Sequence, residues 1–321
     1  MPSNPAADPP ALPCPSGDPA FAGLTVLERG WLSSNNVLLH GQGAGAVLVD
    51  SSHVLHAPQT LALVQCALAG EPLAGIVNTH LHSDHCGGNA CVQGALGASI
   101  TVPAGSFAAA RAWDEDALSY RLTAQRCERF RPDHSLAAGQ SITVGGRSWQ
   151  ALAAPGHDPH SIMLHDAAQG VLISADALWE NGFGVVFPEL DGEAAFDEVA
   201  QVLDLIETLA LRWVIPGHGA AFSDVTAALR RARQRLAAFV ADPARHARHG
   251  IKVLVKYHLM EERQQPWPDY LGWFVGAPLC RSVWQRLGRP EGNLAAFGAR
   301  VAHELVRGGA LVLQDAVLGD A

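Results

Sequence analysis

The sequence is short of charged residues and contains no long apolar segment. Charged residues make up 17% of the 321 positions, whereas hydrophobic residues make up 48%. The formal net charge of −9 argues against a nucleic acid or an anionic membrane surface as the main partner. No apolar run approaches the length of a membrane span, so we expect no transmembrane helix. The composition indicates a soluble globular protein, long enough for one main domain and a smaller one.

Cysteine is also scarce. The six cysteines are scattered, and only Cys86 and Cys91 lie close together in the sequence. This spacing favours free thiols in a reducing cytosol over a disulfide framework. The first basic residue is Arg29, and no apolar region precedes it. We therefore expect no signal peptide and a cytoplasmic location.

The first 20 residues are rich in proline, with seven prolines between residues 1 and 19. Proline lacks the backbone N–H that helices and central strands require. We predict that residues 1–20 form a disordered or extended arm, with ordered structure beginning near Phe21. Such an arm could lie over a neighbouring subunit, which would make the protein a homodimer.

Strands and helices alternate over residues 21–222. Short apolar segments bounded by turn residues predict strands at 24–28, 36–40, 46–50, 73–78, 99–102, 141–144, 148–153, 161–165, 171–174 and 212–216. Apolar periodicity predicts helices at 58–69, 88–96 and 196–211, and mixed helical structure over 103–131.

The pattern changes after residue 223. Helices are predicted at 225–240, 250–262, 278–287 and 292–307, followed by a terminal apolar strand at 310–313. We predict that residues 223–321 form a small helical, winged-helix-like domain. The arginines at 230–235 are interpreted as an exposed, hydrated helix face.

A dense group of metal-binding residue types follows the predicted strand at 73–78. Three histidines and one aspartate occur within six positions: His80, His82, Asp84 and His85. Imidazole and carboxylate groups together suit Zn, Fe, Ni or Mn. The alternative is a polar surface loop that happens to contain histidine. We favour a metal site because four such side chains at ligand spacing rarely cluster otherwise.

Three further residues of the same chemistry follow other predicted strands. His157 and His218 each come after an apolar strand and a Pro-Gly turn, and Asp176 ends the strand at 171–174. Sites in α/β proteins gather at strand ends of this kind. A single histidine in this position would indicate little, but three such strand ends together with the cluster predict one composite site.

These motifs resemble those of the metallo-β-lactamase superfamily of metallohydrolases. His80-Leu81-His82-Ser83-Asp84-His85 is similar to the H-x-H-x-D-H motif, and the later ligands follow in the family's order. The resemblance covers residues 21–222 and implies an α/β fold, an αββα sandwich of two mixed β-sheets. It also implies two zinc ions, with iron or manganese as alternatives. The implied ligands of the first ion are His80, His82 and His157, those of the second are Asp84, His85 and His218, and Asp176 bridges both.

The implied chemistry is hydrolysis of a small-molecule substrate. Seven ligands exceed what one tetrahedral zinc ion requires, but they suit two ions that share a carboxylate. Paired metals generate a metal-bridging hydroxide at neutral pH, which attacks a carbonyl or phosphoryl centre. Asp84 is the predicted catalytic residue because a free carboxylate oxygen could orient this hydroxide. Cys86 has no assigned role and is expected to be a small buried residue.

Differences between this sequence and particular branches of the superfamily narrow the choice of branch. Asp176 argues against a true β-lactamase, which lacks this aspartate. The absence of a large insertion argues against the nuclease branch. Trp179 stands where lactonases commonly have tyrosine, which weakens a lactonase function. A C-terminal helical domain is typical of glyoxalase II-like thioesterases, although their basic glutathione-binding residues have no clear counterpart in this sequence.

A few residues near the motifs are candidates for supporting roles. Trp179, Phe183 and Phe187 follow Asp176 and could form an apolar wall for substrate or, equally, part of the core. His160 follows His157 and is predicted to support a ligand rather than to bind metal itself.

Three functions compete. The first is a dinuclear hydrolase of a small thioester, lactone or ester. The second is a mononuclear non-haem iron oxygenase that resembles persulfide dioxygenases. The third is a binding or regulatory module that uses the winged-helix-like region, against which the acidic charge and the complete ligand set argue.

Overall fold

The computed structural model describes residues 17–321. Most of the predicted Pro-rich arm lies outside these residues, and so does Cys14. The described chain starts with a short 3-10 helix at Pro19–Phe21, and the Asp18 carboxylate caps it by accepting the Ala20 N–H. Regular structure therefore begins slightly before Phe21.

Six strands form the first sheet, in the order β1-β2-β3-β4-β5-β6. Strands β1, β2 and β3 are antiparallel neighbours, whereas β3 to β6 run parallel. Their bounds are Leu24–Leu27, Asn36–Leu39, Ala46–Val49, Leu73–Val77, Ser99–Pro103 and His134–Leu136. The short edge strand β6 was not predicted, because its His-Ser-Leu sequence carries no alternating pattern.

The second sheet has five strands in the order β11-β10-β9-β8-β7. Only β10 and β11 are parallel, so both sheets are mixed, as predicted. The bounds of β7 to β11 are Ser141–Val144, Arg147–Ala153, Ile162–Asp166, Val171–Ala175 and Trp213–Pro216.

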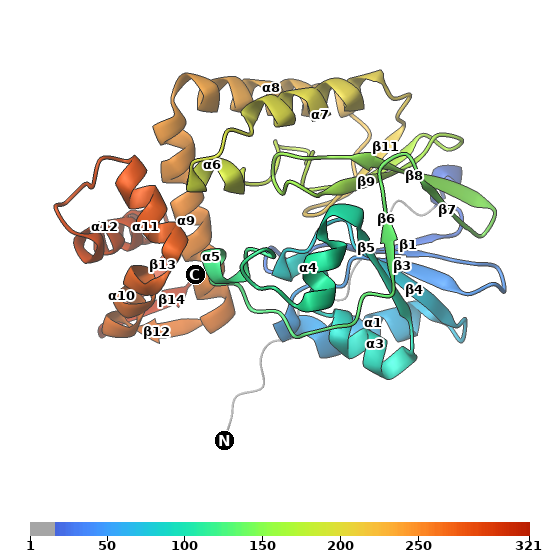
Figure 1. The fold of residues 1–321 in the computed structure, drawn as a ribbon, viewed down its shortest axis with the longest axis horizontal. Coiled ribbons are helices and arrows are strands. Elements are labelled where there is room, and N and C mark those ends of the chain that lie inside the picture. The colour runs from blue at the N-terminus through green and yellow to red at the C-terminus, as the bar shows by residue number, and fades with distance from the viewer. Residues whose placement is uncertain (1–16) are drawn as a thin grey trace.

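The two sheets pack face to face around a shared apolar core. Val49 and Val77 of the first sheet lie in the same buried cluster as Leu164, Ile173 and Ile215 of the second. Helices cover both outer faces (Figure 1). Helices α1 (Ala57–Leu68) and α3 (Asn89–Leu96) pack on the first sheet, and α7 (Phe196–Thr208) and α8 (Val225–Ala241) pack on the second. This is the predicted αββα sandwich.

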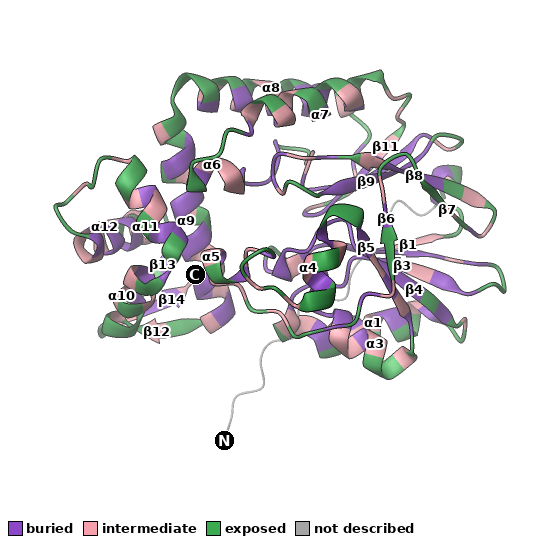
Figure 2. Cartoon of the chain, in the orientation of Figure 1, coloured by how far each residue is buried: buried purple, intermediate pink, exposed green. Residues whose placement is uncertain are grey.

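Figure 2 shows how the outer layer divides between core and solvent. Helices α7 and α8 carry exposed residues on their outer turns, while β9 and β10 are buried throughout. The apolar face of α7 is formed by Val199, Val202, Leu203 and Ile206, which recur at helical spacing and pack on the sheet.

Residues 103–131 were predicted to be helical, and the structure corrects this. Only short helices occur there: a 3-10 helix at Ala104–Ser106, α4 (Phe107–Ala112) and α5 (Tyr120–Thr123). Trp113 and Ala124, which end α4 and α5, adopt the left-handed conformation, and this stops further helical hydrogen bonding. The remaining short helices of the sandwich are a 3-10 helix at Val54–His56, α2 (Ser83–Cys86) and α6 (Phe187–Asp191).

The C-terminal region is helical, as predicted, and the predicted terminal strand is the first strand of a hairpin. Its helices are α9 (Pro243–Glu262), α10 (Trp267–Gly276), α11 (Pro278–Arg286) and α12 (Leu294–Arg307). A three-stranded sheet of order β12-β14-β13 closes it, with bounds Gln264–Pro266, Val317–Asp320 and Leu311–Gln314. Helix α10 was not predicted, because its aromatic sequence lacks a polar face. The boundary after residue 222 stays a prediction.

The C-terminal region is joined to the sandwich by packing and by buried polar contacts. Val185 and Leu190 of the sandwich lie in the same buried cluster as Phe274 and Phe297 of the C-terminal helices.

Across residues 17–321, no helix combines the length and apolar character needed to cross a membrane.

Candidate metal centre

The predicted metal loop lies directly after β4 and is buried. His80 and His85 are 0% exposed, and the short helix α2 starts immediately after His82. The loop packs closely on residues 51–54, since the Ser51 N–H donates to the His85 carbonyl. A side chain at Gly88 would place its Cβ 2.1 Å from the Ser51 carbonyl oxygen, so glycine is required at this position.

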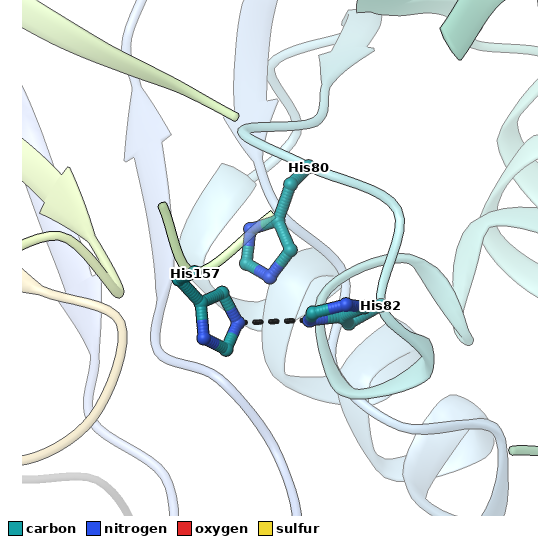
Figure 3. A group of neighbouring side chains, drawn as sticks. All are labelled: His80, His82 and His157. Atoms are coloured by element: carbon teal, nitrogen blue, oxygen red, sulfur yellow. Dashed lines mark hydrogen bonds between the residues drawn. The ribbon is translucent and has the colours of Figure 1, made fainter. Parts of the chain in front are cut away.

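Three histidines converge to form the first ligand group. His80 and His82 come from the loop after β4, and His157 comes from the loop after β8 (Figure 3). Nδ1 of His82 lies 2.8 Å from Nε2 of His157. His157 donates its Nδ1–H to the Val185 carbonyl at 2.6 Å, and this contact directs Nε2 toward the group.

The second ligand group contains Asp84, His85, Asp176 and His218. Asp84 Oδ2 lies 3.1 Å from Nε2 of His218. Asp176 Oδ1 lies 3.5 Å from Nε2 of His85 and 3.9 Å from Nε2 of His218.

Asp176 also reaches the first group. Its other oxygen, Oδ2, lies 3.3 Å from Nε2 of His157. The two carboxylate oxygens therefore face different ligand groups. All seven predicted ligands are thus brought into two adjacent groups, with Asp176 between them.

The side chains fit divalent metal ions. Within the described chain, Nε2 of His80 and Nε2 of His85 are buried and have no hydrogen-bond partner. A buried nitrogen without a partner is costly, and a metal ion would remove that cost. Each group, moreover, has its possible ligand atoms within 4.8 Å of one another. The mixture of imidazole and carboxylate suits zinc, iron or manganese.

The electrostatics of His80, His82 and Asp84 favour the protonation states that bind metal, whereas for His85 burial is outweighed by the carboxylates of Asp176, Asp50 and Asp84, which raise its pKa. Burial, followed by repulsion from His157, lowers the pKa of His82 to about 4. Burial and the neighbouring His85 hold the pKa of His80 well below its usual value. Burial would raise the pKa of Asp84, but attraction to His85 and His218 outweighs it and lowers this pKa to about 2. His80 and His82 are therefore neutral at pH 7 and Asp84 is ionised, as metal binding requires.

Asp50 is a functional residue that sequence reasoning missed. It directly follows β3, is 3% exposed, and accepts hydrogen bonds from the Thr79 N–H and hydroxyl at 2.8 and 2.7 Å. Its Oδ2 also lies 2.7 Å from Nδ1 of His85. The signal that could have found it is the one used for Asp176, because both aspartates follow a buried strand.

The other predicted site residues have distinct surroundings. Trp179 lies at the centre and donates its indole N–H to Asp176 Oδ1 at 3.1 Å. Phe183 is 2% exposed and packs in the core against Phe239, which favours the core-packing alternative for this residue. His160 is exposed, with its ring against Gly105, and its support of a ligand stays a prediction.

Two connected cavities lead to the metal centre. The smaller one, of about 100 Å³, is lined by His82, Asp84, His157, Asp176 and His218. The larger cleft, of about 700 Å³, shares His218 with it. Trp31 and Trp179 also line both cavities, and Trp31 stacks on His218 with ring centres 5.5 Å apart. These two tryptophans therefore flank the passage between the cavities.

The helical region supplies the far wall of the larger cleft. Residues of α9 and α12 line it, including Val253, Met260 and Leu305. The cleft also contains Arg235, although the arginines at 230–235 were predicted to form an exposed face. Arg230 is exposed, whereas Arg231, Arg233 and Arg235 are partly buried. The prediction is wrong for Arg235 in particular, because the face of α8 that carries it turns toward the cleft.

The fold and the paired ligand groups define a metal-binding αββα protein. Residues 29–240, well over half of the chain, match the family model described as Metallo-beta-lactamase superfamily. The chain therefore belongs to the metallo-beta-lactamase superfamily.

Comparisons with individual proteins agree with this assignment. The chain is 30% identical over 157 residues to the hydroxyacylglutathione hydrolase of Anaeromyxobacter dehalogenans, covering 49% of this chain and 51% of that protein. It is 27% identical over 154 residues to the acyl-coenzyme A thioesterase MBLAC2 of Gallus gallus, covering 44% and 55%. The chain thus spans about half the length of the curated relatives it matches.

Solved structures show the same fold. A metallo-beta-lactamase family protein of Thermus thermophilus superposes with a TM-score of 0.53 at 22% identity. The match covers 97% of each chain, so it includes the C-terminal helical region. At this identity the likeness concerns the fold alone.

Proposed function

We propose that this chain is a dinuclear-metal hydrolase that acts on a small thioester. The observation that carries the proposal is the position of Asp176, whose two oxygens face the two ligand groups at 3.3 and 3.5 Å. A shared carboxylate between two complete sets of ligands is suited to a pair of ions. The first ion would be held by His80, His82 and His157, and the second by Asp84, His85 and His218, with Asp176 between them.

We expect two zinc ions, with iron or manganese as alternatives. The two ions would supply Lewis acidity and activate a water molecule. The protein side chains have separate tasks. Asp50 holds His85 in one tautomer, and the Val185 carbonyl does the same for His157. Asp84 directs Oδ2 at His218, which leaves its second oxygen to accept a proton from the attacking water.

The aromatic residues at the passage prepare the site for an acyl substrate. Trp31 covers one face of His218, and the Trp179 indole N–H fixes one oxygen of Asp176. Both rings line the two cavities and give the approach to the ligand groups an apolar wall. The carbonyl of the substrate would thus reach the ligand groups from the larger cleft.

The preference for thioesters is supported by the relatives. Two of the similar proteins are named as a hydroxyacylglutathione hydrolase and an acyl-coenzyme A thioesterase. Trp179 has an N–H to donate but no phenolic hydroxyl, which agrees less well with a lactonase. We therefore rank thioesters above lactones and other esters, and we expect no β-lactam hydrolysis.

The proposal is tested by a panel of substrates with the bound metal quantified in each assay. The panel contains S-acyl glutathione, acyl-coenzyme A, an acyl-homoserine lactone, a phosphodiester and a β-lactam. The expected result is metal-dependent turnover that is fastest for a thioester. Absence of thioester turnover by protein carrying two ions would contradict the proposal, and oxygen uptake on a persulfide with one bound iron would favour the oxygenase alternative.

A further inference from the structure

Arg235 projects from α8 into the wall of the larger cleft and is held on several sides. The carbon at the centre of its guanidinium group lies 5.4 Å from the centre of the Phe183 ring and 5.5 Å from that of Phe239. Its Nη2–H donates to Nε2 of His249 at 2.6 Å. A Cβ at Gly182 would lie 2.8 Å from Nη1, so the loop approaches the guanidinium closely. These contacts fix the guanidinium before any ligand arrives.

Arg235 differs from the neighbouring basic residues in its charge balance. Arg233 pairs with Asp204 and Glu207, Lys252 pairs with Glu304, and Lys256 pairs with Asp320. Within residues 17–321, no carboxylate forms an ion pair with Arg235, and this includes Glu180 and Asp320, which line the same cleft. Burial lowers the pKa of Arg235, but this arginine remains charged at neutral pH.

His249 does not neutralise this charge. Arginine can only donate, so His249 accepts through Nε2 and carries its own proton on Nδ1. Burial, followed by the nearby charges of Arg235 and Lys252, lowers the pKa of His249 to about 4. At neutral pH the pair therefore carries a single positive charge with no anion. A partly desolvated cation of this kind favours an oxyanion, with which it forms charge-assisted hydrogen bonds.

The cleft connects this cation to the metal centre. It is lined by Trp31, Trp179 and His218 of the centre, by Arg235 and His249, and by the apolar side chains of Val253, Met260 and Leu305. A volume of about 700 Å³ accommodates an elongated ligand with groups at both ends.

We propose that Arg235 binds an oxyanion, a carboxylate or a phosphate, at the far end of a substrate whose scissile carbonyl lies at the metal centre. The proposal rests on the proposed hydrolase function for the position of that carbonyl. The proposal places a determinant of substrate specificity on α8, which carries Arg235, because a planar guanidinium can hold two oxygens of one anion at once. The substrate class is thus an acyl compound that carries an anionic group away from its scissile carbonyl.

The test is calorimetric binding of uncleavable thioethers to the metal-loaded full chain. S-methyl coenzyme A carries phosphates, S-methyl glutathione carries carboxylates, and S-methyl-N-acetylcysteamine carries no charge. We expect Arg235→Met to weaken binding of at least one anionic probe by about tenfold or more, as loss of a charge-assisted hydrogen bond does, and to leave the neutral probe unchanged. Weaker binding of S-methyl coenzyme A would identify phosphate as the anion, and weaker binding of S-methyl glutathione would identify carboxylate.

Arg230→Met is the matched control, because Arg230 lies on the same helix, is exposed and lines a different cavity. It should leave all three affinities unchanged. If Arg235→Met does not fold, Arg235→Gln, which keeps a donor for His249, carries the same expectation. The proposal is wrong if the variant that folds binds both anionic probes as tightly as the wild type, or if the wild type prefers neither probe to the neutral one.

Binding is measured without turnover, so the two proposals fail in different ways. Selective loss of anion binding in a protein that hydrolyses no thioester would contradict only the hydrolase. Thioester turnover with unchanged anion binding in Arg235→Met would contradict only the role of Arg235.

Discussion

Asp50 Oδ2 lies 2.7 Å from Nδ1 of His85, and both side chains are almost completely buried. The carboxylate can only accept a proton, so His85 carries its hydrogen on Nδ1 and presents Nε2 to the second ligand group. Asp50 also accepts two hydrogen bonds from Thr79, the residue just before His80. One carboxylate at the end of β3 therefore positions both ends of the metal loop.

Asp50→Asn should weaken metal binding while preserving the fold. The amide is a poorer acceptor for the His85 Nδ1–H, and losses of such supporting contacts typically reduce metal affinity by about 10- to 100-fold. Competition between the protein and a chromophoric chelator would measure this change. Asp197→Asn, on the exposed first turn of α7, is the control and should have the affinity of the wild type.

Trp179→Phe should separate the two roles of this residue. Phenylalanine keeps an aromatic wall at the passage but removes the N–H that donates to Asp176 at 3.1 Å. Losing a hydrogen bond to a charged group should reduce kcat/KM by about tenfold. Steady-state kinetics with equal metal loading would test this, and an unchanged kcat/KM would mean that the indole N–H has no catalytic consequence.

The buried pair between His53 and Glu261 should couple the C-terminal region to the sandwich. His53 Nε2 lies 2.8 Å from Glu261 Oε1, with the side chains 0% and 2% exposed. His53 accepts the Leu55 N–H at Nδ1 and donates to Glu261 through Nε2, so Glu261→Ala leaves a buried donor without its partner and should lower the free energy of unfolding by roughly 1.5–3 kcal/mol. Urea denaturation would measure the loss. In a double-mutant cycle with His53→Ala, simple additivity of the two losses would argue against direct coupling.

Acid should destabilise the chain through His246. Burial, followed by repulsion from His249, lowers the pKa of His246 to about 3 in the folded protein, against an ordinary value near 6.5. The unfolded chain therefore binds the extra proton first. Stability is complete above pH 6.5 and falls as the pH drops toward 3, by up to about 1.4 kcal/mol per pH unit for this residue.

The variant His246→Gln removes this titration and keeps an acceptor for the Val186 N–H. Urea denaturation of the chelator-treated protein between pH 4.5 and 7.5 should show a shallower pH dependence in the variant than in the wild type. Equal slopes would contradict a role for His246 in acid sensitivity.

The sequence predicted which strand-end residues the structure brings together, because each follows a strong local signal. Buried strands such as β10 have continuous apolar sequence, and a polar residue directly after one stands out, as Asp176 does. The same signal marks Asp50, but Asp50 belongs to none of the recognised ligand motifs, so nothing connected it with His85. Its role depends on the parallel pairing of β3 with β4, which places their ends side by side.

Features that depend on helix packing could not be predicted. Arg230 and Arg235 lie on the same helix, and the sequence offers no reason to treat them differently. Only the packing of α8 against α9 and the loop at Gly182 places Arg235 in a cleft. Phe183 was a candidate for the substrate wall, but its ring turns into the core. Its neighbour in sequence, Gly184, packs on His157 instead.

The most direct test of a dinuclear centre is the number of metal ions bound per chain, measured by elemental analysis after full loading and removal of free metal. We predict about two ions in the wild type, and one or fewer in Asp176→Ala, with turnover abolished and the circular dichroism spectrum retained. A wild-type value near one, or an Asp176→Ala variant with two ions and wild-type turnover, would contradict the shared-carboxylate account.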